Sequence, residues 1–246
     1  MKEFFEYEKE LTVNDVDASR SLSLMHITEI LQLLANSNAE RSGYGFEGML
    51  KSNNAFWVIT KIKIVCGDLP KHKEKITCKT WPIKPGKLTL ERDFEIRGTN
   101  GEVAVAATSE WCLIDADTRK IKRIVGEEVM PGLDYIEDRA TVPEYTKQKI
   151  EISDEDFCYE RVIHSTDIDM NGHANNTKYT LMTVDCFSND FLSQNTVNNY
   201  EIHFVKECAE GDKLNIFRKQ TGENSFYITA LKDETQVVFR AFIDFK

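Results

Sequence analysis

The chain has 246 residues, 41% of them hydrophobic, and a formal net charge of −10 at pH 7. This length accommodates one large domain or two small ones, and the acidity argues against nucleic acid as a partner, because phosphate binding needs a basic surface. No apolar run approaches the roughly 20 residues that span a bilayer. The amino-terminal MKEFFEYEKE resembles neither a signal nor a transit peptide, so the sequence predicts a cytosolic protein without membrane association.

The first half is predicted to contain a strand, a long helix and four further strands. Residues 4–14 read as a strand. Within 22–41, apolar residues recur at the spacing of one helix face, and Gly43 is well placed to end the helix. Four runs rich in β-branched and aromatic residues follow, and Asn100-Gly101 is a hairpin signal between the last two. These predicted strands are 55–65, 76–83, 88–98 and 102–115.

Beyond about residue 126 the regular pattern stops. Residues 131–156 contain two prolines, Pro131 and Pro143, many acids and no sustained periodicity, which predicts a linker between domains 1–130 and 157–246. The second domain repeats the order of the first. It is predicted to have a strand over 157–165, a helix over about 174–188 and strands from Tyr200 to the end.

The two halves also match each other in sequence at two places. At an offset of 152 residues, Asp-Val-Asp at 15–17 falls on Asp-Ile-Asp at 167–169. At an offset of 142, the predicted strand at 57–66 falls on residues 199–208. Together with the repeated order of elements, these matches predict a tandem duplication in which each half wraps an antiparallel sheet around a central helix.

The two halves differ in the residues that follow the aligned Asp-x-Asp segments. The first half has Ser19 and Ser21 where the second has Asn171 and His173. A purely structural turn has no need of asparagine and histidine in one copy alone, so the difference points to a functional site in the second half.

The segment DIDMNGHANN also begins like a calcium-binding EF-hand loop. Its twelfth position, counted from Asp167, is Lys178, a cation where the loop requires a bidentate glutamate. A predicted strand precedes the segment, so the helix–loop–helix of an EF-hand is absent. The sequence therefore argues against a calcium site.

The pattern D-x-N-G-H-x-N-N-x-x-Y at 169–179 resembles the catalytic signature of the acyl-acyl-carrier-protein (acyl-ACP) thioesterases of plants and bacteria. VKECAEGD at 205–212 is similar to the glutamate–cysteine segment of that family, and the strands of the first half look like its N-terminal domain. The resemblance covers nearly the whole chain and implies an α+β tandem (double) hotdog fold. The transit segment of plant members is absent, which indicates a bacterial-type member.

The resemblance carries over five candidate catalytic residues, and this sequence has the expected type at each: Asp169, Asn171, His173, Glu207 and Cys208. Thioester hydrolysis needs an activated water and donors for the developing oxyanion. The start of the predicted helix at 174 offers unpaired N–H groups, to which Asn171 and His173 add side-chain donors. Glu207 is assigned to activate water, and Asp169 to orient its neighbours.

An alternative mechanism uses Cys208 as a nucleophile with His173 as its base. Strand alternation places Cys208 on the apolar face with Tyr200, and Glu207 on the opposite face. Glu207 then reaches the site only if a bulge or the end of the strand changes the register. The sequence leaves both mechanisms open.

The resemblance implies no metal and no redox cofactor, and an acyl carrier protein bearing a phosphopantetheine-linked acyl chain as partner. Six lysines between Lys61 and Lys79 form either a solvated surface or a docking patch for such an acidic protein. The first half is expected to hold the acyl chain. None of the six cysteines forms a CxxC pair, which predicts buried thiols.

Three alternatives stay open: an acyl-CoA thioesterase, another hotdog enzyme such as a hydratase, and a non-catalytic acyl-binding module. The sequence does not determine the acyl chain length or saturation. It is compatible with a monomer or a homodimer.

Overall fold

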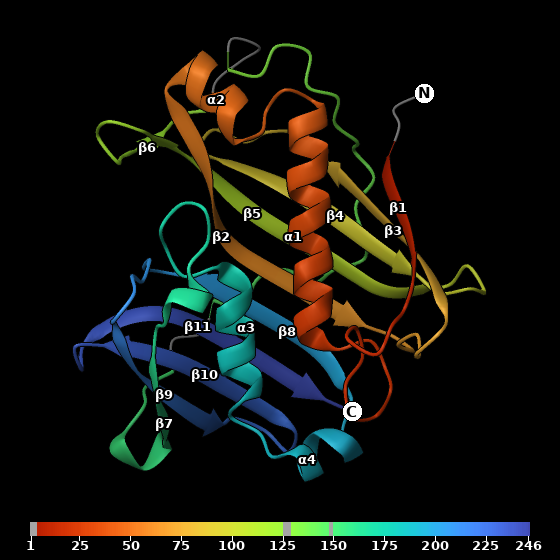
Figure 1. Cartoon of the computed structure of the whole chain (residues 1–246), viewed down its shortest axis with the longest axis vertical. Coiled ribbons are helices and arrows are strands. Elements are labelled where there is room, and N and C mark those ends of the chain that lie inside the picture. Colours follow the sequence, from red (N-terminus) through yellow and green to blue (C-terminus); the bar gives the residue numbers. More distant parts are fainter. Residues whose placement is uncertain (1–3, 125–128, 148–149) are drawn as a thin grey trace.

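One antiparallel sheet of eleven strands runs through residues 4–124, 129–147 and 150–246, the part of the chain that the computed structural model describes (Figure 1). The five strands and the long helix predicted in the first half are confirmed, whereas the sequence predicts neither α2 nor β6. The elements of this half are β1 (Phe5–Glu10), α1 (Leu24–Arg41), α2 (Phe46–Asn53), β2 (Ala55–Cys66), β3 (Lys75–Pro82), β4 (Thr89–Arg97), β5 (Val103–Asp115) and β6 (Ile121–Lys122).

The second half repeats this order with shorter helices. Its elements are the 3-10 turns η1 (Asp154–Asp156) and η2 (Ser165–Asp167), the helices α3 (Asn176–Val184) and α4 (Asn189–Gln194), and the strands β7 (Phe157–Val162), β8 (Val197–Phe204), β9 (Lys213–Gln220), β10 (Ser225–Lys232) and β11 (Gln236–Phe245). The single helix predicted over 174–188 is therefore wrong in its extent. The Ser188 side chain caps a new helix by accepting the Phe191 N–H, which separates α4 from α3.

Local sequence explains the position of α1. The Ser23 hydroxyl accepts the His26 N–H at its start, and Gly43, with φ of +76°, follows the C-terminal cap residue Ser42. An N-cap hydroxyl and a left-handed glycine are the usual ends of a helix. The predicted apolar face is buried, with Ile27, Ile30, Leu31 and Leu34 all in the core.

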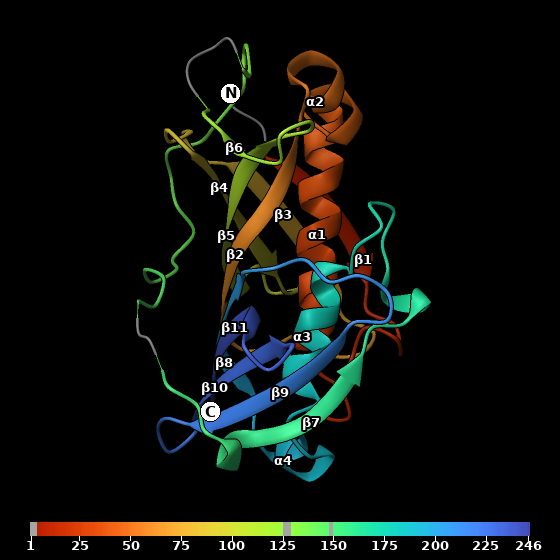
Figure 2. The same ribbon diagram turned by 90° about the vertical axis from the view of Figure 1, so that its left-hand side faces the viewer.

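The strand order shows the internal symmetry. The order is β1-β3-β4-β5-β2-β8-β11-β10-β9-β7, with β6 paired to β5 outside this path. Counted inward from either edge, both halves have the same order, and they join where Ile62 of β2 lies opposite Ile202 of β8. Helices α1 and α3 lie on the same face of the sheet (Figures 1 and 2), and one hydrophobic core includes residues of both halves. This is the predicted tandem hotdog.

The hydrogen bonds correct one of the two sequence matches. The Leu22 N–H donates to Pro70 O at 2.8 Å, and the Ala174 N–H donates to Cys208 O at 2.8 Å. The structural counterpart of Cys208 is therefore Pro70 and not Cys66, so the match at an offset of 142 is wrong. The match at 152 around the Asp-x-Asp segments holds, because the same backbone bonds recur there.

The connection between the halves lies on the face of the sheet opposite the helices (Figure 2). Between β6 and η1 the described residues form no helix or strand, and residues 148 and 149 of the predicted linker lie outside the described ranges. Arg139 Nε donates to the fully buried Asp93 carboxylate at 2.8 Å, and the Thr146 N–H donates to Glu201 at 2.7 Å. Buried carboxylates thus fix the connection to the strands.

The lysine-rich segment is less basic than its sequence indicates. Three of its lysines form ion pairs: Lys61 with Glu110, Lys63 with Glu201, and Lys79 with Glu6. The exposed cations are Lys71, Lys73 and Lys75, in and beside the turn before β3. The lysines of 61–79 that are most accessible to a partner therefore lie in this turn. All six cysteines are free and five are buried, as predicted.

None of the helices in the described ranges combines the length and the apolarity that crossing a bilayer requires.

Candidate active site

The turn that carries the signature residues is built on a buried aspartate at the end of β7. Asp167 is 3% exposed, and both of its carboxylate oxygens lie 3.0 Å from an Arg161 guanidinium nitrogen. The same carboxylate accepts the His164 N–H at 2.9 Å, and the Asp167 carbonyl accepts the Asn175 N–H at 2.8 Å. A buried carboxylate with this many donors is a structural anchor, so Asp167 fixes both ends of the turn.

Asp169 shapes the middle of the turn. Its N–H donates to His173 O at 2.9 Å, and its Oδ1 accepts the Asn171 N–H at 2.8 Å. Gly172 has φ of +79°, a conformation that glycine adopts without a steric penalty. The result is a tight turn from which the side chains of Asn171 and His173 project, with Asn171 exposed and His173 partly exposed.

His173 and Glu207 meet at this turn. His173 Nε2 lies 3.4 Å from Glu207 Oε2, and their side chains are 37% and 40% exposed. A third residue reaches the same oxygen, because Arg119 Nη2 donates to Glu207 Oε2 at 2.6 Å. Imidazole and carboxylate therefore share one accessible place, as acid–base chemistry on a bound molecule requires.

Glu207 reaches this place because β8 ends before it. The strand stops at Phe204, and the N–H groups of both Val205 and Lys206 then donate to Val238 O, at 2.8 and 3.0 Å. Two consecutive donors on one acceptor break the alternation of a strand. The condition derived from the sequence, a bulge or the end of the strand before Glu207, is therefore met, and the end of the strand is what brings the glutamate to His173.

Cys208 lies beneath the site. It is 1% exposed, and burial raises the pKa of its thiol. Because the thiolate is the nucleophilic form, this environment disfavours attack by Cys208. Its carbonyl instead accepts the Ala174 N–H, which ties the loop after β8 to the signature turn.

The start of α3 differs from the expectation. The helix begins at Asn176 with Asn175 as its N-cap. The amides of Ala174, Asn175 and Thr177 donate to Cys208 O, to Asp167 O and to the Asn175 side chain. These amides are therefore unavailable to a bound oxygen, and the side chains of Asn171 and His173 become the main candidate donors.

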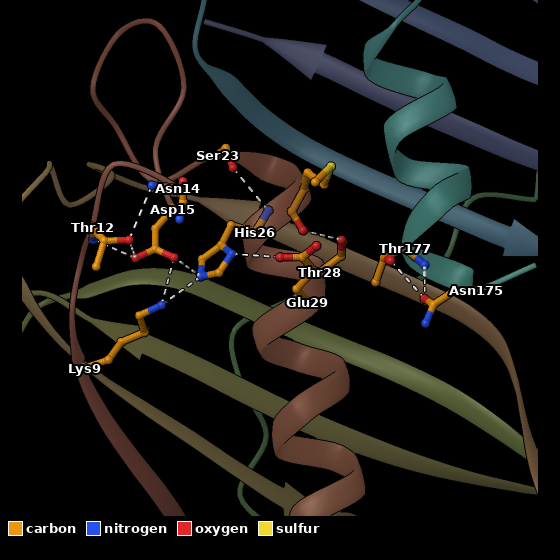
Figure 3. Close-up of polar contacts among 11 residues, drawn as sticks. Lys9, Thr12, Asn14, Asp15, Ser23, His26, Thr28, Glu29, Asn175 and Thr177 are labelled. Carbon is orange, nitrogen blue, oxygen red and sulfur yellow. Dashed lines mark hydrogen bonds and ion pairs between the residues drawn. The ribbon is translucent and has the colours of Figure 1, made fainter. Parts of the chain in front are cut away.

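The corresponding turn of the first half lacks these groups. Asp15 there is bound by Lys9 Nζ at 2.8 Å and by the Thr12 N–H at 2.6 Å, and His26 Nε2 lies 2.6 Å from it (Figure 3). His26 belongs to α1 and also contacts Glu29 at 2.8 Å. Figure 3 also shows Thr177 of α3 and Asn175, the N-cap of that helix, close to Glu29 of α1. The cluster around Asp15 ties β1 to α1.

The sequence predicts Asn171, His173 and Glu207 as residues of one site, but it does not identify Arg119. That arginine follows β5 and is 88 residues from Glu207 in the chain. No local pattern connects the two. The one available signal is the cluster of cations in TRKIKR at 118–123, which identifies a basic hairpin but not its neighbour.

Comparison with known proteins gives a consistent result. A family model described as the acyl-ACP thioesterase N-terminal domain matches residues 2–132, and one described as the acyl-ACP thioesterase C-terminal domain matches residues 150–246. The chain is 24% identical over 219 residues to the chloroplastic palmitoyl-acyl carrier protein thioesterase of Arabidopsis thaliana, an alignment that covers 85% of this chain and 53% of that protein. It is 22% identical over 228 residues to the oleoyl-acyl carrier protein thioesterase 2 of the same plant, covering 86% and 62%. The chain thus spans between half and two thirds of the length of these relatives.

Solved structures show the same likeness. An acyl-ACP thioesterase from Bacteroides thetaiotaomicron VPI-5482 superposes with a TM-score of 0.88 at 26% identity, covering 99% of this chain and 98% of that one. The 12:0-ACP thioesterase from Umbellularia californica also gives 0.88, at 20% identity, covering 99% and 97%. The second likeness concerns the fold alone.

Proposed function

The chain belongs to the acyl-ACP thioesterase family, and from this premise we propose that it hydrolyses the thioester of fatty acyl-ACP to a free fatty acid and the holo carrier protein. The observation that carries the proposal is the pair formed by His173 Nε2 and Glu207 Oε2 at 3.4 Å, beside the exposed Asn171. It supplies a base and hydrogen-bond donors at one accessible place. Such a reaction places the protein in fatty acid metabolism.

In the proposed mechanism, Glu207 accepts a proton from a water molecule as the water oxygen attacks the thioester carbon. The negative charge that develops on the carbonyl oxygen is stabilised by the side chains of Asn171 and His173. The carbon–sulfur bond then breaks, and the departing sulfur takes from Glu207 the proton that the water gave up, which yields the free thiol and restores the carboxylate. Asp169 acts indirectly, because its carboxylate holds the Asn171 amide and so fixes the turn.

The alternative in which Cys208 is the nucleophile is less well supported. Its thiol is 1% exposed, and burial raises its pKa, whereas an attacking cysteine needs an accessible thiolate. Glu207 is 40% exposed on its side chain and can meet both water and substrate. We therefore assign the activation of water to Glu207 and a packing role to Cys208.

The two halves have different proposed roles. The second, 157–246, carries the reacting groups, and the first, 1–130, holds the acyl chain against the core between its sheet and α1. Trp81 lies outside that core, because it packs against Ile83, Ala106 and Ala140 in a separate cluster that includes the connection. Residues 1–3 and 125–128 of the first half lie outside the described ranges.

The proposed partner is an acyl carrier protein with its phosphopantetheine arm, and acyl-CoA is the alternative substrate. The exposed lysines of the turn before β3 are candidates to contact an acidic carrier protein. We also propose a reducing compartment such as the cytosol, because all six cysteines are free and free thiols are typical of such compartments.

The test is to incubate the protein with a mixed pool of acyl-ACPs and to identify the released fatty acids by mass spectrometry, with acyl-CoA thioesters assayed in parallel. We expect release from acyl-ACP that exceeds release from acyl-CoA at equal concentration. A preference for acyl-CoA would select the alternative substrate. Absence of hydrolysis with both would contradict the proposed function and favour a non-catalytic acyl-binding module.

A further inference from the structure

Arg119 belongs to the hairpin between β5 and β6, in the half of the molecule that lacks the signature turn. The Asp115 carboxylate accepts the Thr118 N–H at 2.9 Å and so closes this hairpin. The Arg119 N–H donates to Asp115 O at 3.0 Å. The hairpin is also tied to the end of α2, because the Asn54 side chain donates to Asp117 at 2.6 Å. Contacts within the first half thus fix the backbone position of Arg119.

The conformation of Arg119 is unusual. Its φ is +57°, a left-handed conformation that costs a residue with a Cβ about 1–2 kcal/mol. Glycine or asparagine would fit this place more easily. Strained residues persist where the surrounding contacts over-determine them, and they occur often at functional sites. The contacts of the Arg119 side chain indicate a functional reason for this backbone conformation.

The Arg119 guanidinium extends across to the second half. Its Cζ lies 5.1 Å from the centre of the Phe56 ring of β2, an arrangement in which a cation is attracted to the ring face. Nη2 then donates to Glu207 Oε2 at 2.6 Å. This is the same oxygen that lies 3.4 Å from His173 Nε2. The ring and the carboxylate together define where the guanidinium sits.

We propose that Arg119 is a positioning residue for Glu207, through which the first half orients the carboxylate that activates water in the second half. The inference rests on the proposed function. With Oε2 occupied by Arg119 and His173, Oε1 is the oxygen that accepts the proton from the attacking water.

Removal of the guanidinium takes away the contact that orients the Glu207 carboxylate, which lowers the rate of the chemical step. His173, which lies 3.4 Å from the same carboxylate oxygen, remains in an Arg119 variant.

The experiment compares the wild type with Arg119→Gln, Arg119→Lys and the control Arg123→Gln, which removes an exposed cation near the end of the same hairpin. The values of kcat and KM are measured with an acyl-CoA and with the corresponding acyl-pantetheine, which has no phosphate. For Arg119→Gln we expect kcat to fall roughly 10- to 100-fold, as when a residue that orients a catalytic group is lost. KM is expected to change little.

Arg119→Lys is expected to restore only part of kcat, because it keeps the charge but not the planar guanidinium. Arg123→Gln is expected to match the wild type. Unchanged kcat in Arg119→Gln would overturn the inference, and so would a rise in KM confined to the acyl-CoA, which would mean that Arg119 binds the substrate phosphate. A wild type that hydrolyses no acyl thioester would instead overturn the proposed function, and this inference with it.

Discussion

The turn at 15–23 and the turn at 167–175 share a backbone but not their side chains. In the first, the Asp17 N–H donates to Ser21 O at 2.9 Å, and in the second the Asp169 N–H donates to His173 O at 2.9 Å. The bond from Ser23 to Asp15 O likewise recurs from Asn175 to Asp167 O. The side chains of Asp17 and Asp169 each accept the N–H two residues further on.

The differences fall at three places. Ser19 and Ser21 replace Asn171 and His173, and Leu69, the residue before Pro70, stands where Glu207 precedes Cys208. The architecture of the turn therefore needs the two aspartates and a left-handed residue, but neither histidine nor asparagine. Residues that the fold does not require and that only one copy has are the best candidates for chemistry.

The largest expected effect comes from removing the imidazole. His173→Ala should lower kcat/KM on the order of 1,000-fold, because general acid–base and oxyanion groups contribute roughly 100- to 10,000-fold each. The matched change Ser21→Ala in the first half should leave the activity unchanged. Thermal unfolding of both variants checks that the fold is intact. Full activity in a folded His173→Ala protein would place the chemistry elsewhere.

The second comparison separates Glu207 from its neighbour. Glu207→Gln removes the proposed base at constant size, and we expect hydrolysis to fall by about 100-fold or more. Cys208→Ala should stay within a few-fold of the wild type in rate while losing some stability. Measurement of single-turnover rates for both variants decides between water activation and a cysteine nucleophile. An inactive, folded Cys208→Ala protein would favour the nucleophile.

A third prediction concerns the Asp15 cluster, whose cation and backbone donor recur around Asp167 as Arg161 and the His164 N–H. Burial raises the pKa of the Asp15 carboxyl, but hydrogen bonds from Lys9 and Thr12 and the nearby His26 lower it more, so its pKa is below the usual 3.8. The ionised carboxylate therefore stabilises the fold above about pH 4, and this contribution is lost as the pH falls below that value. Asp15→Asn should cost on the order of 2 kcal/mol of unfolding free energy at pH 7.

Urea unfolding at pH 7 and at pH 3 measures this contribution. The difference between wild type and Asp15→Asn should shrink at the lower pH, and the exposed control Glu10→Gln should have no effect at either. An equal difference at both pH values would mean that the ionised form of Asp15 does not stabilise the fold.

The smallest effect is expected at the left-handed position of each turn. Gly172 has φ of +79°, and a Cβ added there would meet no described atom within 4 Å, while its counterpart Arg20 has φ of +65°. Gly172→Ala should therefore cost about 1 kcal/mol from backbone strain alone. Arg20→Gly should be nearly neutral, because relief of strain is offset by the greater freedom of the unfolded chain. Chemical denaturation measures both; a loss in Arg20→Gly as large as that in Gly172→Ala would contradict the equivalence of the two turns.

Much of the molecule could be predicted from local patterns. The helix at 24–41 follows from a capping serine, a 3.6-residue apolar period and a terminal glycine, and the strands follow from runs of β-branched residues. The comparison of 15–21 with 167–173 identifies Asn171 and His173 because the two copies are aligned by their aspartates. Two predictions were wrong: the extent of the helix over 174–188, and the sequence match at an offset of 142 residues. Both depend on where a loop ends.

By itself, the sequence determined the order of elements, the duplication and the turn that carries the candidate chemistry. Each of these follows from the spacing of residues that are close together in the chain. Only the tertiary structure decided that Glu207 lies beside His173, since that depends on β8 ending at Phe204 and on two amides sharing Val238 O. It also decided that Arg119 reaches the same carboxylate from 88 residues away. Contacts of this kind join segments that are far apart in the chain, which no local pattern encodes.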